Sequence, residues 1–134
     1  MEIDHLTVPV RNYEVGKRFY AEALEPLGFR ILLDWPDRRR AYLGVHSRPS
    51  SLWVVESAFA GTLEVSLAVP DRASVVAFHT AALAVGGRSL AEPGIREEHD
   101  SGYYAARIAD FDGNAIEAVY RDVAKSVSDN RAAA

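Results

Sequence analysis

The sequence contains no cysteine. This absence excludes disulfide bridges, thiolate metal sites and cysteine nucleophiles. Long hydrophobic runs are missing as well, since no segment stays apolar for the roughly 20 residues that a membrane-spanning helix needs. The first residues, Met1 to His5, lack the basic and then apolar pattern of a secretory signal. We therefore expect a cytoplasmic protein that does not contact a membrane.

A concentration of positive charge is also missing. The chain has 15 Lys and Arg residues against 19 Asp and Glu residues, and the basic ones are scattered rather than grouped. This distribution gives no support to nucleic-acid binding, which needs a basic face. What is present is a chain of 134 residues with ordinary hydrophobic content. That length suits one domain with a substantial core.

The alternation of apolar and polar residues, with the turn signals between them, predicts the secondary structure. Asn12 and Asp71 are placed to cap two helices, over about 13–24 and 72–85. The predicted strands span residues 3–10, 29–33, 41–45, 51–55, 62–69, 88–91, 103–109 and 115–120. An irregular stretch is expected at 92–101. A polar C-terminal tail, at 123–134, is expected to be loosely docked.

The order of one strand, one helix and three strands occurs twice, and the two copies align. A shift of 59 positions, from 5 to 64, places His5 on Glu64 and Asn12 on Asp71, and it needs no gap across roughly 25 positions. We therefore predict two tandem βαβββ modules, over about 1–59 and 60–122, within a single domain. Neither module alone would bury enough apolar surface to be stable, so the two must pack together.

Residues 110–120, Asp-Phe-Asp-Gly-Asn-Ala-Ile-Glu-Ala-Val-Tyr, hold a turn signal and then an apolar strand. Asp, Gly and Asn tolerate positive φ and favour a sharp reversal. The strand carries one carboxylate, Glu117, and burying it without a partner would cost several kcal/mol. Glu117 therefore needs solvent, a hydrogen-bond partner or a cation. Aligning the last strands of the two modules places Trp53 at the position of Glu117.

Several segments carry a resemblance to a known superfamily. They are His5-Leu6-Thr7-Val8-Pro9-Val10, Phe19-Tyr20 with Leu24, Leu27-Gly28-Phe29, Ala68-Val69-Pro70-Asp71, and residues 110–117 with Phe111 where proline is usual. Through them the chain, over about residues 1–121, resembles the vicinal oxygen chelate superfamily of glyoxalase I, bleomycin-resistance proteins and extradiol dioxygenases. The resemblance implies an α+β fold. In it, two βαβββ modules form a cupped, open mixed sheet with helices outside and a divalent metal in a central cleft.

The resemblance also implies a set of metal ligands. Carried over by position, these are His5, Glu64 and Glu117, although Glu64 stands where many members have a histidine. One imidazole and two carboxylates suit Mn²⁺, Fe²⁺, Zn²⁺ or Ni²⁺, and leave positions open for an oxygenated substrate. Trp53 stands where some members have a fourth ligand. Its indole nitrogen only donates, so we interpret Trp53 as a cavity wall or a platform for a flat ligand.

A simpler arrangement is open to the same residues. His5 and Glu64 could hydrogen-bond to each other across the module interface, with Glu117 satisfied by Arg107 or a tyrosine. In that case no ion is needed. Convergence of the three side chains on one point would favour a metal, whereas an arginine at that point would oppose it.

The segment 94–106 supplies further candidates. It holds Gly-x-Arg, then His99, then Tyr-Tyr-Ala-Ala, which resembles a subgroup of the same superfamily. His99 could move a proton or contact a substrate, or be a surface residue among acidic neighbours. Arg96 could bind an anionic substrate or simply be solvated. Tyr103 and Tyr104 face opposite ways on a strand, so at most one lines the cleft.

Two classes of function follow. The first is a metal-dependent lyase, isomerase or dioxygenase acting on a small oxygenated molecule, with Glu117 and His99 in catalytic roles. The second is a metal-free protein that binds a planar molecule against Trp53 and tyrosines, as in the bleomycin-resistance branch. The ligand set, altered but still polar at three positions, favours the enzyme. No organic cofactor is expected in either case. The resemblance also implies a homodimer, because many two-module members pair to complete their clefts.

Overall fold

Each half of the chain folds into one strand, one helix and three further strands. The computed structural model describes residues 1, 3–48, 50–96 and 102–122, so the predicted tail at 123–134 lies outside the described residues. The first half holds β1 (His5–Val10), α1 (Tyr13–Ala23), η1 (Glu25–Leu27), β2 (Arg30–Trp35), η2 (Pro36–Arg38), β3 (Arg40–Gly44) and β4 (Ser51–Glu56). The second half holds β5 (Glu64–Ala68), α2 (Arg72–Ala84), β6 (Arg88–Ile95), β7 (Tyr103–Ala109) and β8 (Ala115–Arg121). The elements η1 and η2 are single turns of 3₁₀ helix.

Each half forms its own four-stranded mixed sheet. The first has the order β1-β4-β3-β2 and the second β5-β8-β7-β6, with one parallel pair in each. The registers repeat as well, because Trp53 lies opposite Thr7 and Glu117 lies opposite Ser66, at the same place in the two ladders. The predicted α+β fold of two tandem βαβββ modules is confirmed. So is the alignment of Trp53 with Glu117.

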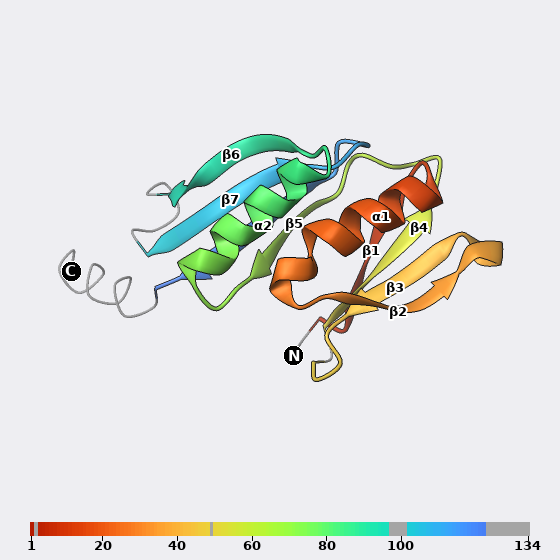
Figure 1. Cartoon of the computed structure of the whole chain (residues 1–134), viewed down its shortest axis with the longest axis horizontal. Helices are drawn as coiled ribbons and strands as arrows, with labels where there is room; N and C mark the ends of the chain where they lie inside the picture. The colour runs from red at the N-terminus through yellow and green to blue at the C-terminus, as the bar shows by residue number, and fades with distance from the viewer. Residues whose placement is uncertain (2, 49, 97–101, 123–134) are drawn as a thin grey trace.

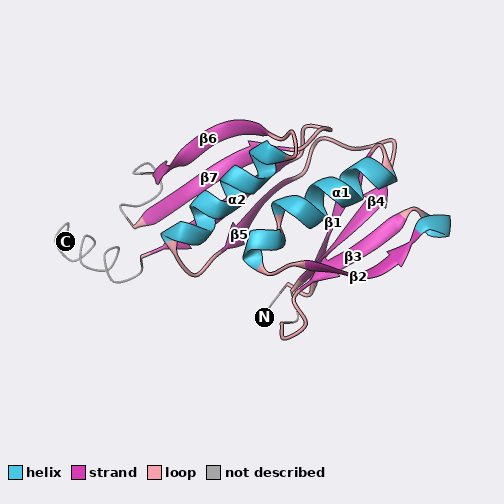
Figure 2. Ribbon diagram, viewed as in Figure 1, coloured by secondary structure: helices cyan, strands magenta, loops and turns pink. Residues whose placement is uncertain are grey.

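Both helices lie on the same side of the two sheets and contact each other between the modules, as Figure 1 and Figure 2 show. They begin as predicted. The Asn12 side chain accepts from the Val15 N–H at 3.0 Å, and the Asp71 carboxylate accepts from the Ser74 N–H at 2.7 Å. None of the helices in the described part of the chain is long and apolar enough to cross a membrane.

The main core lies between the helices and the sheets. Its largest fully buried side chains include Phe19, Tyr20, Leu24, Leu43, Val54, Phe78, Ile108 and Ile116. Because side chains alternate along a strand, every second residue of these sheets points away from the helices. We call that side of each sheet its open face, and neither helix covers it.

Strand β6 is longer than predicted. The sequence indicated a strand at 88–91 and then an irregular stretch from Glu92, but β6 continues to Ile95. Its register against β7 shifts between Ser89 and Ala91 and again beyond Ala91. The Pro-Gly pair in this segment is therefore accommodated by irregular pairing, which proline and glycine tolerate in an edge strand.

The turn after β7 joins the two modules through buried hydrogen bonds. Asn114, which has no exposed surface, donates from Nδ2 to the Pro9 carbonyl at 2.8 Å. Its Oδ1 accepts from the backbone N–H groups of Gly61 and Leu63, both at 3.1 Å. The predicted turn is confirmed. The Asn114 side-chain amide also connects the end of β1, the segment between the modules and the start of β8.

Asp110 and Tyr20 extend this connection into the first helix. The buried Asp110 carboxylate accepts from the Tyr20 hydroxyl at 2.6 Å and from Asn114 Nδ2 at 2.8 Å. Burial raises the pKa of the Tyr20 hydroxyl well above its ordinary value, and the Asp110 carboxylate raises it further. We call Tyr20, Asp110 and Asn114 the junction network.

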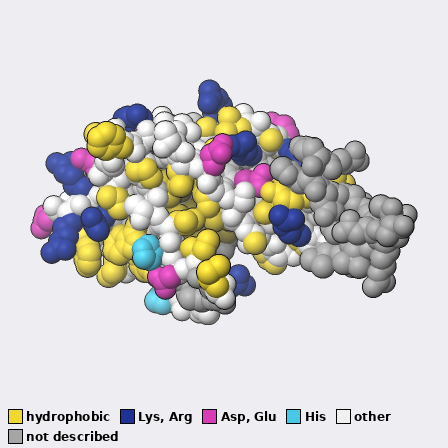
Figure 3. Space-filling view, turned by 180° about the vertical axis from the view of Figure 1, so that it is seen from behind, with side chains coloured by type: hydrophobic (Ala, Val, Ile, Leu, Met, Phe, Trp, Pro, Cys, Tyr) yellow, Lys and Arg dark blue, Asp and Glu magenta, His cyan; other side chains and the backbone are white. Residues whose placement is uncertain are grey.

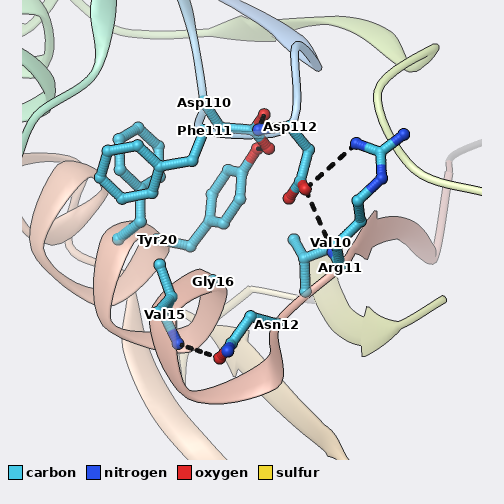
Figure 4. Close-up of a pocket in the computed structure, with 10 residues that line it drawn as sticks. Val10, Arg11, Asn12, Val15, Gly16, Tyr20, Asp110, Phe111 and Asp112 are labelled. Carbon is cyan, nitrogen blue, oxygen red and sulfur yellow. Dashed lines mark hydrogen bonds and ion pairs between the residues drawn. The ribbon is translucent and has the colours of Figure 1, made fainter. Parts of the chain in front are cut away.

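A small pocket opens beside the junction network, between α1 and the turn. Figure 4 shows Tyr20 directed at Asp110, and Asp112 facing Arg11, whose backbone N–H donates to it at 3.2 Å. The pocket volume is about 70 Å³. Sites for organic ligands usually exceed about 300 Å³. This pocket is therefore too small for one, and the residues around it hold the fold.

Candidate functional site

The open face of the second sheet gathers five polar side chains. Strand alternation places Glu64 and Ser66 there from β5, Tyr103 and Arg107 from β7, and Glu117 from β8. A pocket of about 250 Å³ lies among them. The structure thus brings the two predicted ligand carboxylates to one place.

Both carboxylates of this pocket already have partners from the chain. Glu64 Oε1 accepts from Arg107 Nη2 at 2.5 Å. Glu117 Oε1 accepts from the Ser66 hydroxyl at 2.8 Å and from the Tyr103 hydroxyl. Partial burial raises the pKa of Tyr103, and its hydrogen bond to Glu117 raises it further. The Tyr103 hydroxyl therefore stays protonated and donates a hydrogen bond to the carboxylate.

The open face of the first sheet carries rings instead of carboxylates. The Trp53 ring centroid lies 4.7 Å from that of Tyr42 and 5.7 Å from that of Trp35. We call these three residues the aromatic cluster. The guanidinium groups of Arg38 and Arg40 lie 5.4 Å from the Trp35 ring and 5.7 Å from the Trp53 ring. Figure 3 shows this side, with hydrophobic side chains gathered over the first module and basic ones along its outer rim.

His5 lies apart from the two glutamates. On β1 it is opposite Ser51, and its Nδ1 is 2.9 Å from Asp4 Oδ1. It does not line the pocket that holds Glu64 and Glu117. Within the described part of the chain, no three His, Cys, Asp or Glu side chains lie close enough to hold a metal ion. Within one chain, His5, Glu64 and Glu117 do not come together as metal ligands. Metal ligation by these three residues stays a prediction.

The remaining predicted site residues do not lie together. Tyr103 lies on the open face, whereas Tyr104 lies on the opposite face and packs against the main core. Arg96 is turned back onto its own strand, where it donates to backbone carbonyls of β6. His99 lies outside the described residues. The catalytic and substrate-binding roles of these residues stay predictions.

Sequence reasoning selected Trp53 but missed the neighbours that complete its cluster. The alternation along residues 40–44 was a signal that could have placed Tyr42 on the same face. No such signal exists for Trp35, because a bulge between Ile31 and Leu33 shifts the alternation of β2. The pairing and register of β2, β3 and β4 bring the three rings of the aromatic cluster together.

Comparisons with known proteins identify the fold. Neither models of protein families nor curated protein sequences match the chain. A solved glyoxalase/bleomycin resistance protein from Albidiferax ferrireducens T118 is 28% identical, with a TM-score of 0.75 over 89% of this chain and 98% of that one. TnmS3, an antibiotic binding protein from Streptomyces sp. CB03234, is 24% identical, with a TM-score of 0.68 over 91% and 97%. A glyoxalase-related enzyme from Fulvimarina pelagi is 17% identical, with a TM-score of 0.70 over 92% and 90%.

These structures place the chain among proteins with the glyoxalase, bleomycin resistance and dioxygenase fold. The fold is that of the vicinal oxygen chelate superfamily, so the resemblance found in the sequence is confirmed. The similar proteins include both an enzyme and a binding protein, by their names. The fold alone therefore does not decide the function, which has to be argued from the site.

Proposed function

We propose that this protein binds a planar small molecule without a metal, on the open face that carries the aromatic cluster. The observation that carries the proposal is the pairing on the other open face. Arg107 supplies a positive charge to Glu64, and Tyr103 and Ser66 supply hydrogen-bond donors to Glu117. Because the chain itself satisfies both carboxylates, neither needs a cation to be stable there.

The aromatic cluster supplies flat apolar surface for a planar ligand. Trp35 is 41% exposed, so it presents flat apolar surface to solvent. A ligand that covers this surface gains about 25 cal/mol for each Å² removed from water. Stacking against Trp35 or Trp53 adds about 0.5–1.5 kcal/mol. The antibiotic binding protein among the similar structures supports the same class of function.

We further propose that the protein is a homodimer. In the described chain β1 and β5 each pair with a strand on one side only. The register of β5 directs the backbone groups of Glu64, Ser66 and Ala68 toward its free edge. A groove of about 610 Å³ is lined by residues of both modules, among them Leu6 of β1 and Leu67 of β5. Free edges beside an apolar groove favour association, and a second copy can pair its own edges there.

A metal-dependent lyase, isomerase or dioxygenase is the second candidate. It is favoured by the repeated register, since His5 and Glu64 begin equivalent strands of the two sheets. A dimer with unlike open faces opposite each other would bring an imidazole toward the two carboxylates. Such a site would also require Arg107 to leave Glu64.

Elemental analysis separates the two candidates. The untagged protein is incubated with Mn²⁺, Fe²⁺, Ni²⁺ and Zn²⁺, freed of unbound metal and analysed, as wild type and as Glu117→Gln. We expect far less than one ion per chain in both. A stoichiometric ion in the wild type that is lost in Glu117→Gln would contradict metal-free binding. Sedimentation equilibrium on the same samples tests the dimer, which should have twice the mass of one chain.

A further inference from the structure

The aromatic cluster lies beside two positive charges that the described chain leaves unpaired. Arg38 and Arg40 form no ion pair with any described residue. Their guanidinium groups instead lie over the rings of Trp35 and Trp53. Arg40 Nε is buried and has no hydrogen-bond partner within the described chain. The nearby carboxylate of Asp34 already accepts from Lys17 at 2.9 Å. Two cationic groups are therefore available to an anion at this face.

The turn that presents these arginines is held in an unfavourable backbone conformation. Arg39, between them, has φ 51°, and it is the only described residue other than glycine with positive φ. That region costs free energy for any residue with a β-carbon. Glu56 holds the turn, because it accepts from Arg39 Nη1 at 3.2 Å and from the Tyr13 backbone N–H at 3.0 Å. Arg39 thus fixes the turn on whose two sides Arg38 and Arg40 lie.

We propose that the ligand is a planar aromatic anion, with its ring on the aromatic cluster and its anionic group between Arg38 and Arg40. This inference rests on the proposed function, since it names the ligand class of the same face. Leu33 and Trp35, 44% and 41% exposed on β2, provide apolar surface for the ring to cover. Carboxylates and sulfonates match the donors of a guanidinium group. A neutral or cationic ligand would desolvate both charges without compensating them.

Two probes with the same rings test this proposal. They are 1-anilinonaphthalene-8-sulfonate, which is anionic, and N-phenyl-1-naphthylamine, which lacks the sulfonate. The chain has two tryptophans, and both Trp35 and Trp53 belong to the aromatic cluster. Energy transfer from tryptophan to a bound probe reports binding to the protein, and the loss of affinity in the arginine variants assigns that binding to this face. The dissociation constants of both probes are measured for the wild type, Arg38→Gln and Arg40→Gln.

The matched control is Arg18→Gln, which removes an arginine that pairs with Glu22 on the exposed side of α1. Each variant is first shown to melt as the wild type does. We expect the sulfonate probe to bind about tenfold more tightly than the neutral one. Arg38→Gln and Arg40→Gln should each weaken binding of the sulfonate probe alone, by about tenfold. Arg18→Gln should change neither dissociation constant.

The possible failures are distinguishable. Equal affinities for the two probes, unchanged in Arg38→Gln and Arg40→Gln, would overturn the anionic ligand class while leaving planar binding at the cluster intact. Tight binding of the sulfonate probe that Arg18→Gln weakens equally would also overturn it, because the charge effect would then be general. Absence of energy transfer with either probe would contradict the proposed function itself.

Discussion

The hydroxyl of Tyr20 donates a 2.6 Å hydrogen bond to the carboxylate of Asp110, across 90 positions of the chain. Both groups are buried, so the bond is protected from water. We predict that Tyr20→Phe, which removes only the hydroxyl, lowers the free energy of unfolding at neutral pH by about 1.5–3 kcal/mol, the range for a bond to a charged group. Urea unfolding followed by circular dichroism measures the change. An unchanged transition midpoint would contradict the structural importance of this bond.

The same residue predicts how stability depends on alkaline pH. Burial raises the pKa of Tyr20 above that of the unfolded chain, which is about 10. The contribution of the protonated hydroxyl is therefore fully present below pH 10 and is lost as the pH rises through the folded-state pKa. The wild type should lose stability between about pH 10 and 11 more steeply than Tyr20→Phe. Parallel pH profiles for the two proteins would show that Tyr20 titrates as it does in the unfolded chain.

Substitution of Asn114 should lower the free energy of unfolding more than Tyr20→Phe does. Asn114→Ala removes four hydrogen bonds, three of them to partly buried backbone groups of Pro9, Gly61 and Leu63. We expect a loss of about 3–5 kcal/mol in the free energy of unfolding. The control is Asn12→Ala, the same substitution at an exposed helix cap, which should cost about 1 kcal/mol. Similar losses at the two positions would show that Asn114 acts only within its own turn.

Gly61→Ala tests whether there is room for one added methyl group between the modules. Its φ is +102°, and a β-carbon there would lie 2.3 Å from the Asp112 carbonyl oxygen. Gly28 also has positive φ, +87°, but its nearest neighbour would be 3.7 Å away. Gly28→Ala should therefore cost only the backbone strain, about 1 kcal/mol, and Gly61→Ala about 1–3 kcal/mol more. Equal costs in urea unfolding would exclude a steric requirement at Gly61.

Arg107→Gln tests whether the chain's own cation substitutes for a metal. The Arg107 and Glu64 side chains are 39% and 74% exposed, so breaking their ion pair should change stability by less than about 1 kcal/mol. The variant leaves Glu64 and Glu117 on one open face without the guanidinium. We expect Mn²⁺ and Zn²⁺ to bind this variant more tightly than the wild type, as measured by calorimetry.

The control for this prediction is the double variant Arg107→Gln with Glu64→Gln. It removes the freed carboxylate as well as the guanidinium, so the gain in metal affinity should disappear. Identical metal affinities in the wild type, the single variant and the double variant would show that Arg107 does not stand in for a cation.

The features that the sequence predicted correctly depend on short separations or on the repeat. Asn12 and Asp71 cap their helices through residues three positions away, so the signal is local. The duplication is visible because the two modules align without a gap over their first halves. The shared register of Trp53 and Glu117 then follows, because equivalent strands pair in the same way.

The partners of the two carboxylates were not predictable in the same way. The sequence offered Arg107 or a tyrosine as a partner for Glu117, and the register does place Arg107 opposite Glu117. The guanidinium nevertheless reaches to Glu64, while Tyr103 donates to Glu117. A long arginine side chain can reach several acceptors on one face of a sheet. The choice between them depends on the positions of all neighbours rather than on spacing in the sequence.

His79 shows how tertiary packing decides the surroundings of a helix residue. It lies on α2 and is buried, and its Nε2 lies 2.8 Å from the Ser89 hydroxyl. Strand β6 extends to Ile95 and packs beside this part of α2. The periodicity of the helix does not contain that information, because tertiary packing decides which flank is covered.

The junction network has a consequence for the rate at which this protein folds. Its hydrogen bonds connect residues that are 90 and 105 positions apart. Contacts at such separations raise the contact order, and chains dominated by them fold over milliseconds to seconds rather than microseconds. Each sheet can form its ladder from residues of one half, but the bonds from Asn114 to Pro9 and from Tyr20 to Asp110 form only when both halves have come together. Because neither module buries enough apolar surface to be stable alone, the two halves should fold and unfold together.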